Sequence, residues 1–292
     1  MNIGMAIRSG FALSGGVVLA AALTVAASAE TPRERGAYLV RTIAGCGNCH
    51  TPKDASGRAI AGQELSGGVE FDIPPGHAVA ANITPDPETG IGSWSEVQVV
   101  TALRDGRRPD GTIIGPPMPF DFYRQLSDSD AAAIAAYLRS IRPIRHAVAK
   151  SQYKIPLPQS YGPPVTHVDA PSRADKVAYG AYLAGPVGHC MECHTPFAEP
   201  GKLDMSRLGA GGREFAVFTD PGAQVVARNI TADPDHGIGK GSDLDIKRAI
   251  TTGIRPDGTK LVRTMAFDWY AKIAPADLDA IVAYLRSLPP VK

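Results

Sequence analysis

The segment C-G-N-C-H at residues 46–50 recurs as C-M-E-C-H at residues 190–194, and the two segments contain all four cysteines of the chain. In a C-x-x-C-H motif, both thiols can form thioethers with the vinyl groups of one haem, and the adjacent histidine then binds the iron. The repeated motif therefore predicts two covalently bound haem c groups. The predicted attachment residues are Cys46, Cys49, Cys190 and Cys193, and the predicted iron ligands are His50 and His194.

Other uses of paired cysteines fit this pattern less well. Exported proteins often join their cysteines in disulfides, and a zinc site needs further cysteines or histidines at ligand spacing. A thioredoxin-like C-x-x-C needs no following histidine. Because a histidine follows both pairs and no cysteine lies elsewhere, covalent haem is favoured over all three alternatives.

The haem motifs belong to a longer internal repeat. The segment G-A-Y-L at residues 36–39 recurs at residues 180–183, with the same 144-residue offset that separates the motifs. After a three-residue insertion the offset becomes 147, and it relates N-I-T (82–84 and 229–231), R-P-D-G-T (108–112 and 255–259) and Y-L-R-S (137–140 and 284–287). Two copies of one module explain this pattern better than a solenoid.

The repeat divides the chain into four expected parts. These are a signal peptide at residues 1–29, a first domain at 30–143, a Pro-rich linker at 144–171 and a second domain at 172–292. Helix caps and turn residues predict a few short helices joined by Gly- and Pro-rich loops in each domain, and no strand-like alternation stands out. We therefore predict an all-α fold.

Residues 1–29 have the pattern of an export signal. They contain one charged residue, Arg8, followed by an apolar stretch and by A-S-A at residues 27–29. An uncleaved membrane anchor is the alternative, but serine and glycine interrupt the stretch, which is short for a span. The whole chain carries 30 basic and 29 acidic residues, so bulk positive charge gives no reason to expect nucleic-acid binding.

Met118 and Met265 are the candidates for the sixth iron ligands. Of the six methionines, only these two are related by the 147-residue offset, and they follow the motif histidines by 68 and 71 residues. A thioether is a soft, neutral ligand that favours ferrous iron and raises the reduction potential. Core packing is the commoner role of methionine, but the paired position inside a haem module favours ligation.

Four polar residues also recur in both modules: Asn82, Arg108, Asn229 and Arg255. Each could hydrogen-bond a haem propionate, and arginine suits carboxylates particularly well. The same residues could equally form loops or place charge at helix ends. Both interpretations stay open at the level of the sequence.

With these motifs, residues 33–288 resemble class I-type c cytochromes in tandem. The chain is most similar to the multihaem cytochrome c subunits of bacterial periplasmic alcohol, gluconate or aldehyde dehydrogenases, which often carry three haem modules where this chain has two. The resemblance implies two tandem cytochrome c domains and an electron carrier with no catalytic residues. It also implies location in the periplasm, either free or associated peripherally with the outer face of the inner membrane.

The resemblance implies partners as well. Electrons would come from a dehydrogenase catalytic subunit and leave toward a quinone, a small cytochrome or an oxidase. The alternative is an enzyme, either a dihaem peroxidase or an oxidoreductase of small sulfur compounds. Such an enzyme needs an iron with an open or displaceable ligand position, so its optical spectrum would show a high-spin haem.

The surroundings of the two candidate methionines differ, because module one has P-P-M-P at residues 116–119 and module two has R-T-M-A at residues 263–266. The environment of the axial ligand helps to set a haem potential. We therefore predict unequal reduction potentials for the two haems. A potentiometric titration of the holoprotein should require two midpoints, and one midpoint that fits both haems would contradict the prediction.

Overall fold

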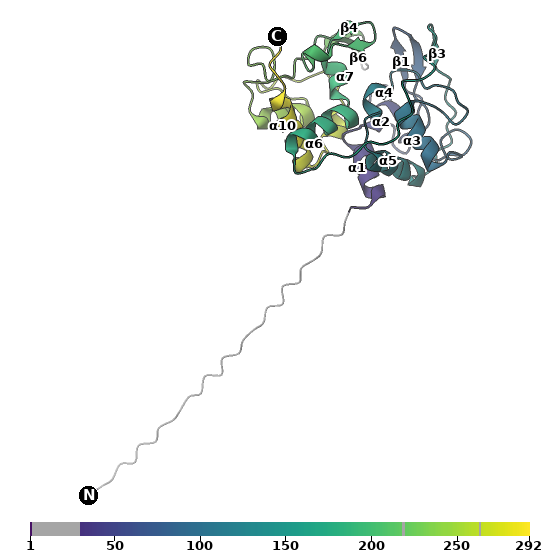
Figure 1. The fold of residues 1–292 in the computed structure, drawn as a ribbon, viewed down its shortest axis with the longest axis horizontal. Coiled ribbons are helices and arrows are strands. Elements are labelled where there is room, and N and C mark those ends of the chain that lie inside the picture. Colours follow the sequence, from purple (N-terminus) through teal and green to yellow (C-terminus); the bar gives the residue numbers. More distant parts are fainter. Residues whose placement is uncertain (2–29, 218–219, 263) are drawn as a thin grey trace. The chain divides into compact units, whose positions relative to one another are not determined.

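The computed structural model describes Met1 and residues 30–217, 220–262 and 264–292. The predicted signal peptide therefore lies outside the described residues, apart from Met1. Residues Thr31–Lys292 form one unit, which is shown in Figure 1. Among the helices of the described ranges, none is both long enough and apolar enough to cross a lipid bilayer.

Short helices make up most of the regular structure (Figure 1). In chain order they are α1 (Pro32–Arg41), α2 (Cys46–His50), α3 (Glu96–Asp105), α4 (Phe120–Tyr123), α5 (Asp128–Ser140), α6 (Lys176–Tyr182), α7 (Cys190–His194), α8 (Asp243–Thr252), α9 (Phe267–Tyr270) and α10 (Pro275–Ser287). A π-helical turn at Leu183–Val187 continues α6, and a 3-10 turn lies at Met205–Arg207.

The described residues also contain three small antiparallel sheets. Their strands are β1 (Glu70–Ile73), β2 (Gly76–Val79), β3 (Gln152–Tyr153), β4 (Phe197–Glu199), β5 (Lys202–Leu203), β6 (Glu214–Val217) and β7 (Asp220–Val226). The first sheet has the order β1-β2-β3, and the pairs β4-β5 and β6-β7 form the others.

The prediction of an all-α fold is wrong, because the structure, over its described residues, is only 35% helical and its strands give it mixed α/β content. Most of these strands have two to four residues, which is too short to show a reliable alternation of apolar and polar side chains. The pairing of β3 is also non-local, because Gln152 and Tyr153 of the predicted linker pair with His77 and Gly76 of β2. Local patterning cannot reveal such a pair.

The first and last helices of each module cross closely, α1 on α5 and α6 on α10, through one glycine each. A Cβ added at Gly36 would lie 1.9 Å from the carbonyl oxygen of Ala133, and a Cβ added at Gly180 would lie 1.9 Å from that of Ala280. Any larger residue would push the backbones apart. The two glycines occupy equivalent positions, so both modules are built on the same crossing.

The first helix of module one also reaches the last helix of module two. Tyr38 of α1 donates its hydroxyl to Asp277 Oδ2 at 2.7 Å, and the backbone N–H of Ala274 donates to the Tyr38 hydroxyl at 3.1 Å. Asp277 lies in the first turn of α10 and Ala274 is its N-cap. The tyrosine therefore takes the place of a capping side chain at the start of the helix.

Tyr182 of module two makes the equivalent contact with the last helix of module one. Tyr182 donates to Asp130 Oδ2 at 2.8 Å, and the backbone N–H of Ser127 donates to the Tyr182 hydroxyl at 3.2 Å. On this side only, Arg35 adds a bidentate ion pair with Asp130 at 2.8 and 2.9 Å, and its equivalent in module two is Tyr179. The interface is thus nearly two-fold symmetric, with one buried charge pair that breaks the symmetry.

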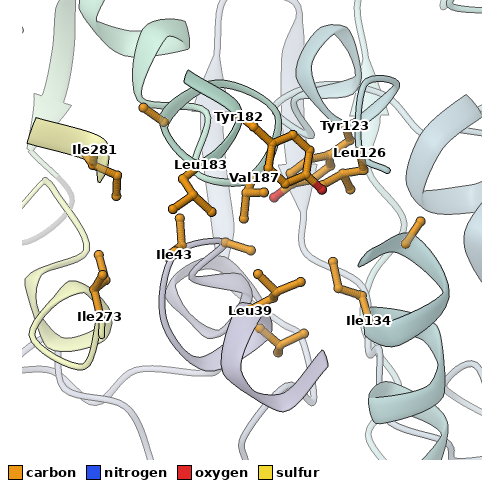
Figure 2. Close-up of a cluster of buried hydrophobic side chains, with 14 of the residues drawn as sticks. Leu39, Ile43, Tyr123, Leu126, Ile134, Tyr182, Leu183, Val187, Ile273 and Ile281 are labelled. Carbon is orange, nitrogen blue, oxygen red and sulfur yellow. The ribbon is translucent and has the colours of Figure 1, made fainter. Parts of the chain in front are cut away.

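One hydrophobic cluster continues through both modules, and Figure 2 shows its centre. Side chains from α1 and α5 meet side chains from the α6 end and from α10. The residues labelled there are Leu39, Ile43, Tyr123, Leu126, Ile134, Tyr182, Leu183, Val187, Ile273 and Ile281. Burial of this shared apolar surface stabilises the contact between the modules.

The predicted linker packs against module one. The Tyr153 hydroxyl donates to the carbonyl of Pro116 at 2.7 Å, and the Tyr161 hydroxyl donates to that of Ile114 at 2.8 Å. The segment is thus attached next to the chain that leads to Met118. The exact domain boundaries drawn from the sequence stay a prediction.

We predict that Gly36→Ala and Gly180→Ala will each lower the free energy of unfolding by about 1–3 kcal/mol, because the added Cβ overpacks a helix crossing. Denaturant unfolding of the holoprotein measures the effect. Gly185→Ala is the matched control, since a Cβ there meets no atom within 4 Å. Equal stabilities for all three variants would show that the close crossing is not a constraint.

Candidate functional site

Each C-x-x-C-H motif forms a short helix, α2 in module one and α7 in module two. The two cysteines of a motif lie three residues apart, so one helical turn brings both thiols to the same face. Both helices begin after a residue in the left-handed region, Gly45 with φ 55° and His189 with φ 40°. The four thiols are half-buried and form no disulfide.

Burial sets the protonation state of these thiols. It raises the pKa of Cys46 and Cys193 to about 12 and that of Cys49 and Cys190 to about 11. The thiols are therefore uncharged near neutral pH.

The motif histidines are oriented by backbone carbonyls. His50 Nδ1 lies 2.8 Å from the oxygen of Ala81, and His194 Nδ1 lies 2.6 Å from that of Arg228. A carbonyl can only accept, so Nδ1 carries the proton and Nε2 keeps the lone pair that binds a metal. Burial lowers the pKa of both imidazoles, which favours the neutral form that ligation requires.

These two carbonyls are functional groups that the sequence interpretation missed. Ala81 and Arg228 occupy equivalent positions in the repeat, directly before the two N-I-T segments. Their side chains differ completely, because only the backbone oxygen makes the contact. The recurring signal was the N-I-T segment that follows them, and its interpretation was limited to side chains.

Two buried threonines hold the end of each motif. Thr51 Oγ1 accepts from the backbone N–H of Leu65 at 3.0 Å, and Thr195 Oγ1 accepts from that of Gly209 at 3.3 Å. Both threonines are at most 2% exposed. They recur at the 144-residue offset, so the repeat could have identified them. They fix the chain that leaves each attachment helix.

The predicted sixth ligands lie just before two short helices. Met118 precedes α4 and Met265 precedes α9, and both side chains are half-buried. Their carbonyls accept from Phe120 N–H at 3.0 Å and from Phe267 N–H at 2.9 Å. The two segments thus have the same local conformation. Iron ligation by these methionines stays a prediction.

The predicted propionate residues make hydrogen bonds within loops. Asn82 Oδ1 accepts from the N–H and hydroxyl of Thr84 at 2.9 and 2.7 Å, and its Nδ2 donates to the carbonyl of Ile144 at 2.8 Å. Asn229 makes the same pair of bonds to the threonine two residues later and donates to the carbonyl of Val291 at 2.5 Å. Both asparagines thus tie the N-I-T loop to the chain that follows the last helix of the module.

The two arginines also have nearby partners. Arg108 Nη1 donates to the carbonyl of Ile113 at 3.0 Å, and Arg255 Nη1 donates to Thr259 Oγ1 at 2.9 Å. These contacts fit the loop-forming interpretation. A propionate contact for either arginine or either asparagine stays a prediction.

The residues present fit a covalently bound haem in each module. Each motif offers two uncharged thiols on one face of a helix, beside an imidazole whose Nε2 is left to bind iron. The same arrangement, with the same carbonyl hydrogen bond, occurs in both modules. Cys46, Cys49 and His50 would hold one haem, and Cys190, Cys193 and His194 would hold the other.

Comparison with known proteins agrees with this geometry. The family described as "Cytochrome c" matches residues 34–142. The diheme cytochrome c-type protein of Cereibacter sphaeroides is 32% identical over 260 residues, which cover 85% of this chain and 83% of that protein.

Subunits of dehydrogenases are similar as well. The cytochrome c subunit of the quinone alcohol dehydrogenase of Gluconacetobacter polyoxogenes is 33% identical, covering 88% of this chain and 56% of the relative. The fructose dehydrogenase cytochrome subunit of Gluconobacter japonicus is 34% identical, covering 90% and 54%. The chain thus spans little more than half the length of these two relatives.

We predict that Met118→His and Met265→His will each lower one of the two haem midpoints, because imidazole stabilises ferric iron more than a thioether does. Each variant should also remove about half of the sulfur-to-iron charge-transfer absorption. Spectroelectrochemistry of the holoprotein measures both effects. Met205→His is the control, since Met205 is 63% exposed and has no counterpart in module one. Unchanged spectra in the first two variants would exclude these methionines as ligands.

Proposed function

The chain belongs to the dihaem c-type cytochromes, and we propose that it receives electrons from a dehydrogenase catalytic subunit and passes them to a respiratory acceptor. It carries two covalently bound haem c groups, one on each C-x-x-C-H motif. Bound haem supplies one-electron chemistry, while the protein sets its ligands, polarity and exposure.

One observation carries the proposal: the two modules orient their motif histidines in the same way. The hydrogen bonds from His50 to Ala81 and from His194 to Arg228 connect equivalent atoms of the repeat. A catalytic haem would be expected to differ from a carrier haem at the sixth ligand position, where catalysis needs an open site, and each module here has a methionine at the equivalent position of the repeat. Two matching sites, each with a paired methionine, are what a carrier requires.

The relatives support a carrier as well. Those from Gluconacetobacter polyoxogenes and Gluconobacter japonicus are named as cytochrome subunits of dehydrogenases, not as catalytic subunits. This agrees with the prediction of an electron-transfer protein and speaks against the peroxidase and sulfur-compound alternatives. A dehydrogenase of alcohols, sugars or sugar acids is accordingly the partner that we propose.

The acceptor and the compartment are parts of the same proposal. We propose a quinone, a small cytochrome or an oxidase as the acceptor, and the periplasm as the location, because residues 1–29 have the pattern of an export signal. The formal charge of the chain is +1. So small a net charge gives little long-range steering, and docking should depend on local surface patches.

The proposal predicts that a tagged chain purified from its native host will retain a dehydrogenase subunit. Adding the substrate of that subunit should reduce both haems, which optical spectroscopy measures. The separated holoprotein is the control, and the same substrate should leave it oxidised. Reduction of the separated chain by substrate, or turnover of peroxide by it, would replace the carrier with the enzyme alternative.

A further inference from the structure

Module two covers the first haem-attachment helix. A Cβ added at Gly47, between the two cysteines of α2, would lie 2.9 Å from Trp269 Nε1 and 3.2 Å from Trp269 Cζ2. A Cβ added at Gly45 would lie 3.7 Å from Ala266 Cβ. The segment that follows Met265 in module two therefore packs directly on the motif of module one.

Module one makes a corresponding contact with the second motif. The ring of Tyr123 in α4 meets the ring of His189 edge-on, with centroids 5.8 Å apart and planes at 86°. His189 is the N-cap of α7, immediately before Cys190, and Tyr123 follows Met118 by five residues. Each segment that carries a predicted sixth ligand thus contacts the attachment region of the other module.

The residues at equivalent positions differ in size in a complementary way. Trp269 corresponds to Phe122, and Gly47 corresponds to Met191. Trp269, the larger aromatic residue, faces the glycine. Phe122, the smaller one, belongs to α4, the helix that contacts the attachment region containing Met191. Met191 is 2% exposed and belongs to the hydrophobic cluster on which Phe122 packs.

We propose that each haem site of this chain is completed by the other module, with Trp269 as the residue that positions and shields the first attachment helix. Because the apolar shell around a site controls its access to water, and thereby its potential, the potential of the haem on Cys46 and Cys49 depends on a residue of module two. This inference goes beyond the proposed function and does not depend on which dehydrogenase is the partner.

A double-mutant cycle on the purified holoprotein tests the coupling. Gly47→Ala alters the first motif and should move the midpoint of the first haem, which is identified as the midpoint that is lost in a Cys46→Ala, Cys49→Ala variant. Trp269→Phe should move the same midpoint. The shift in the double variant should differ from the sum of the single shifts, because shortening the aromatic residue makes room for the added Cβ. Unfolding free energies should show the same non-additivity.

Trp269→Ala tests the direction of the effect. Opening the first site to water favours ferric iron, so the ferrous-to-ferric ratio of the first haem at a fixed potential should fall by about tenfold, which is 59 mV for a one-electron couple. Covalent haem content, measured beforehand, must equal that of the parent protein. If the alanine variant loses haem, the midpoint of the first haem is measured in Trp269→Phe instead.

Phe122→Leu is the matched control at the equivalent position of module one. It should shift the midpoint of the second haem. Its effects on the two midpoints should simply add to those of Gly47→Ala. The proposal is overturned if the Trp269 variants leave the first midpoint unchanged, or if they move only the midpoint of their own module. Strict additivity of Gly47→Ala and Trp269→Phe in both potential and stability would overturn it equally.

Discussion

The hydrogen bond from each motif histidine to a backbone carbonyl is the interaction on which the two sites depend. It fixes the tautomer, and so decides which ring nitrogen is left for iron. It also links the attachment helix to the loop that begins with an asparagine, and that asparagine ties the loop to the chain beyond the last helix. Motif, loop and module end are therefore a single connected structure, present twice.

The contact between the modules also consists of two equivalent halves. A tyrosine from the first helix of each copy binds the start of the last helix of the other copy, through Asp277 on one side and Asp130 on the other. Arg35 forms an ion pair with Asp130 and so compensates its negative charge, whereas the equivalent position in module two is Tyr179. A buried ion pair gains little net stability once desolvation is included, but removal of one partner is costly. Both members of this pair lie in module one, so its main effect is to compensate the buried charge of the aspartate that receives Tyr182 of module two.

The cofactor could be predicted from the sequence, but the contact between the two modules could not. The family and the two haem c groups are confirmed, because a repeated C-x-x-C-H is a local and specific signal, and the electron-carrier role stays a proposal. The all-α fold was wrong, because strands such as β3 are short and pair across a long stretch of chain. The carbonyls of Ala81 and Arg228 had no side-chain signal. The contact of Trp269 with Gly47 was not predictable either, because a sequence repeat shows that two modules are present but not whether they pack on each other.

The near two-fold interface has a consequence for how the duplicated chain could diverge. Once the two copies packed on each other, each became part of the environment in which the other was selected. A change at Gly47 would first require a change at Trp269, more than 200 positions away. We therefore expect the two halves to have accumulated their differences in matched pairs, so that neither half can be exchanged for its twin.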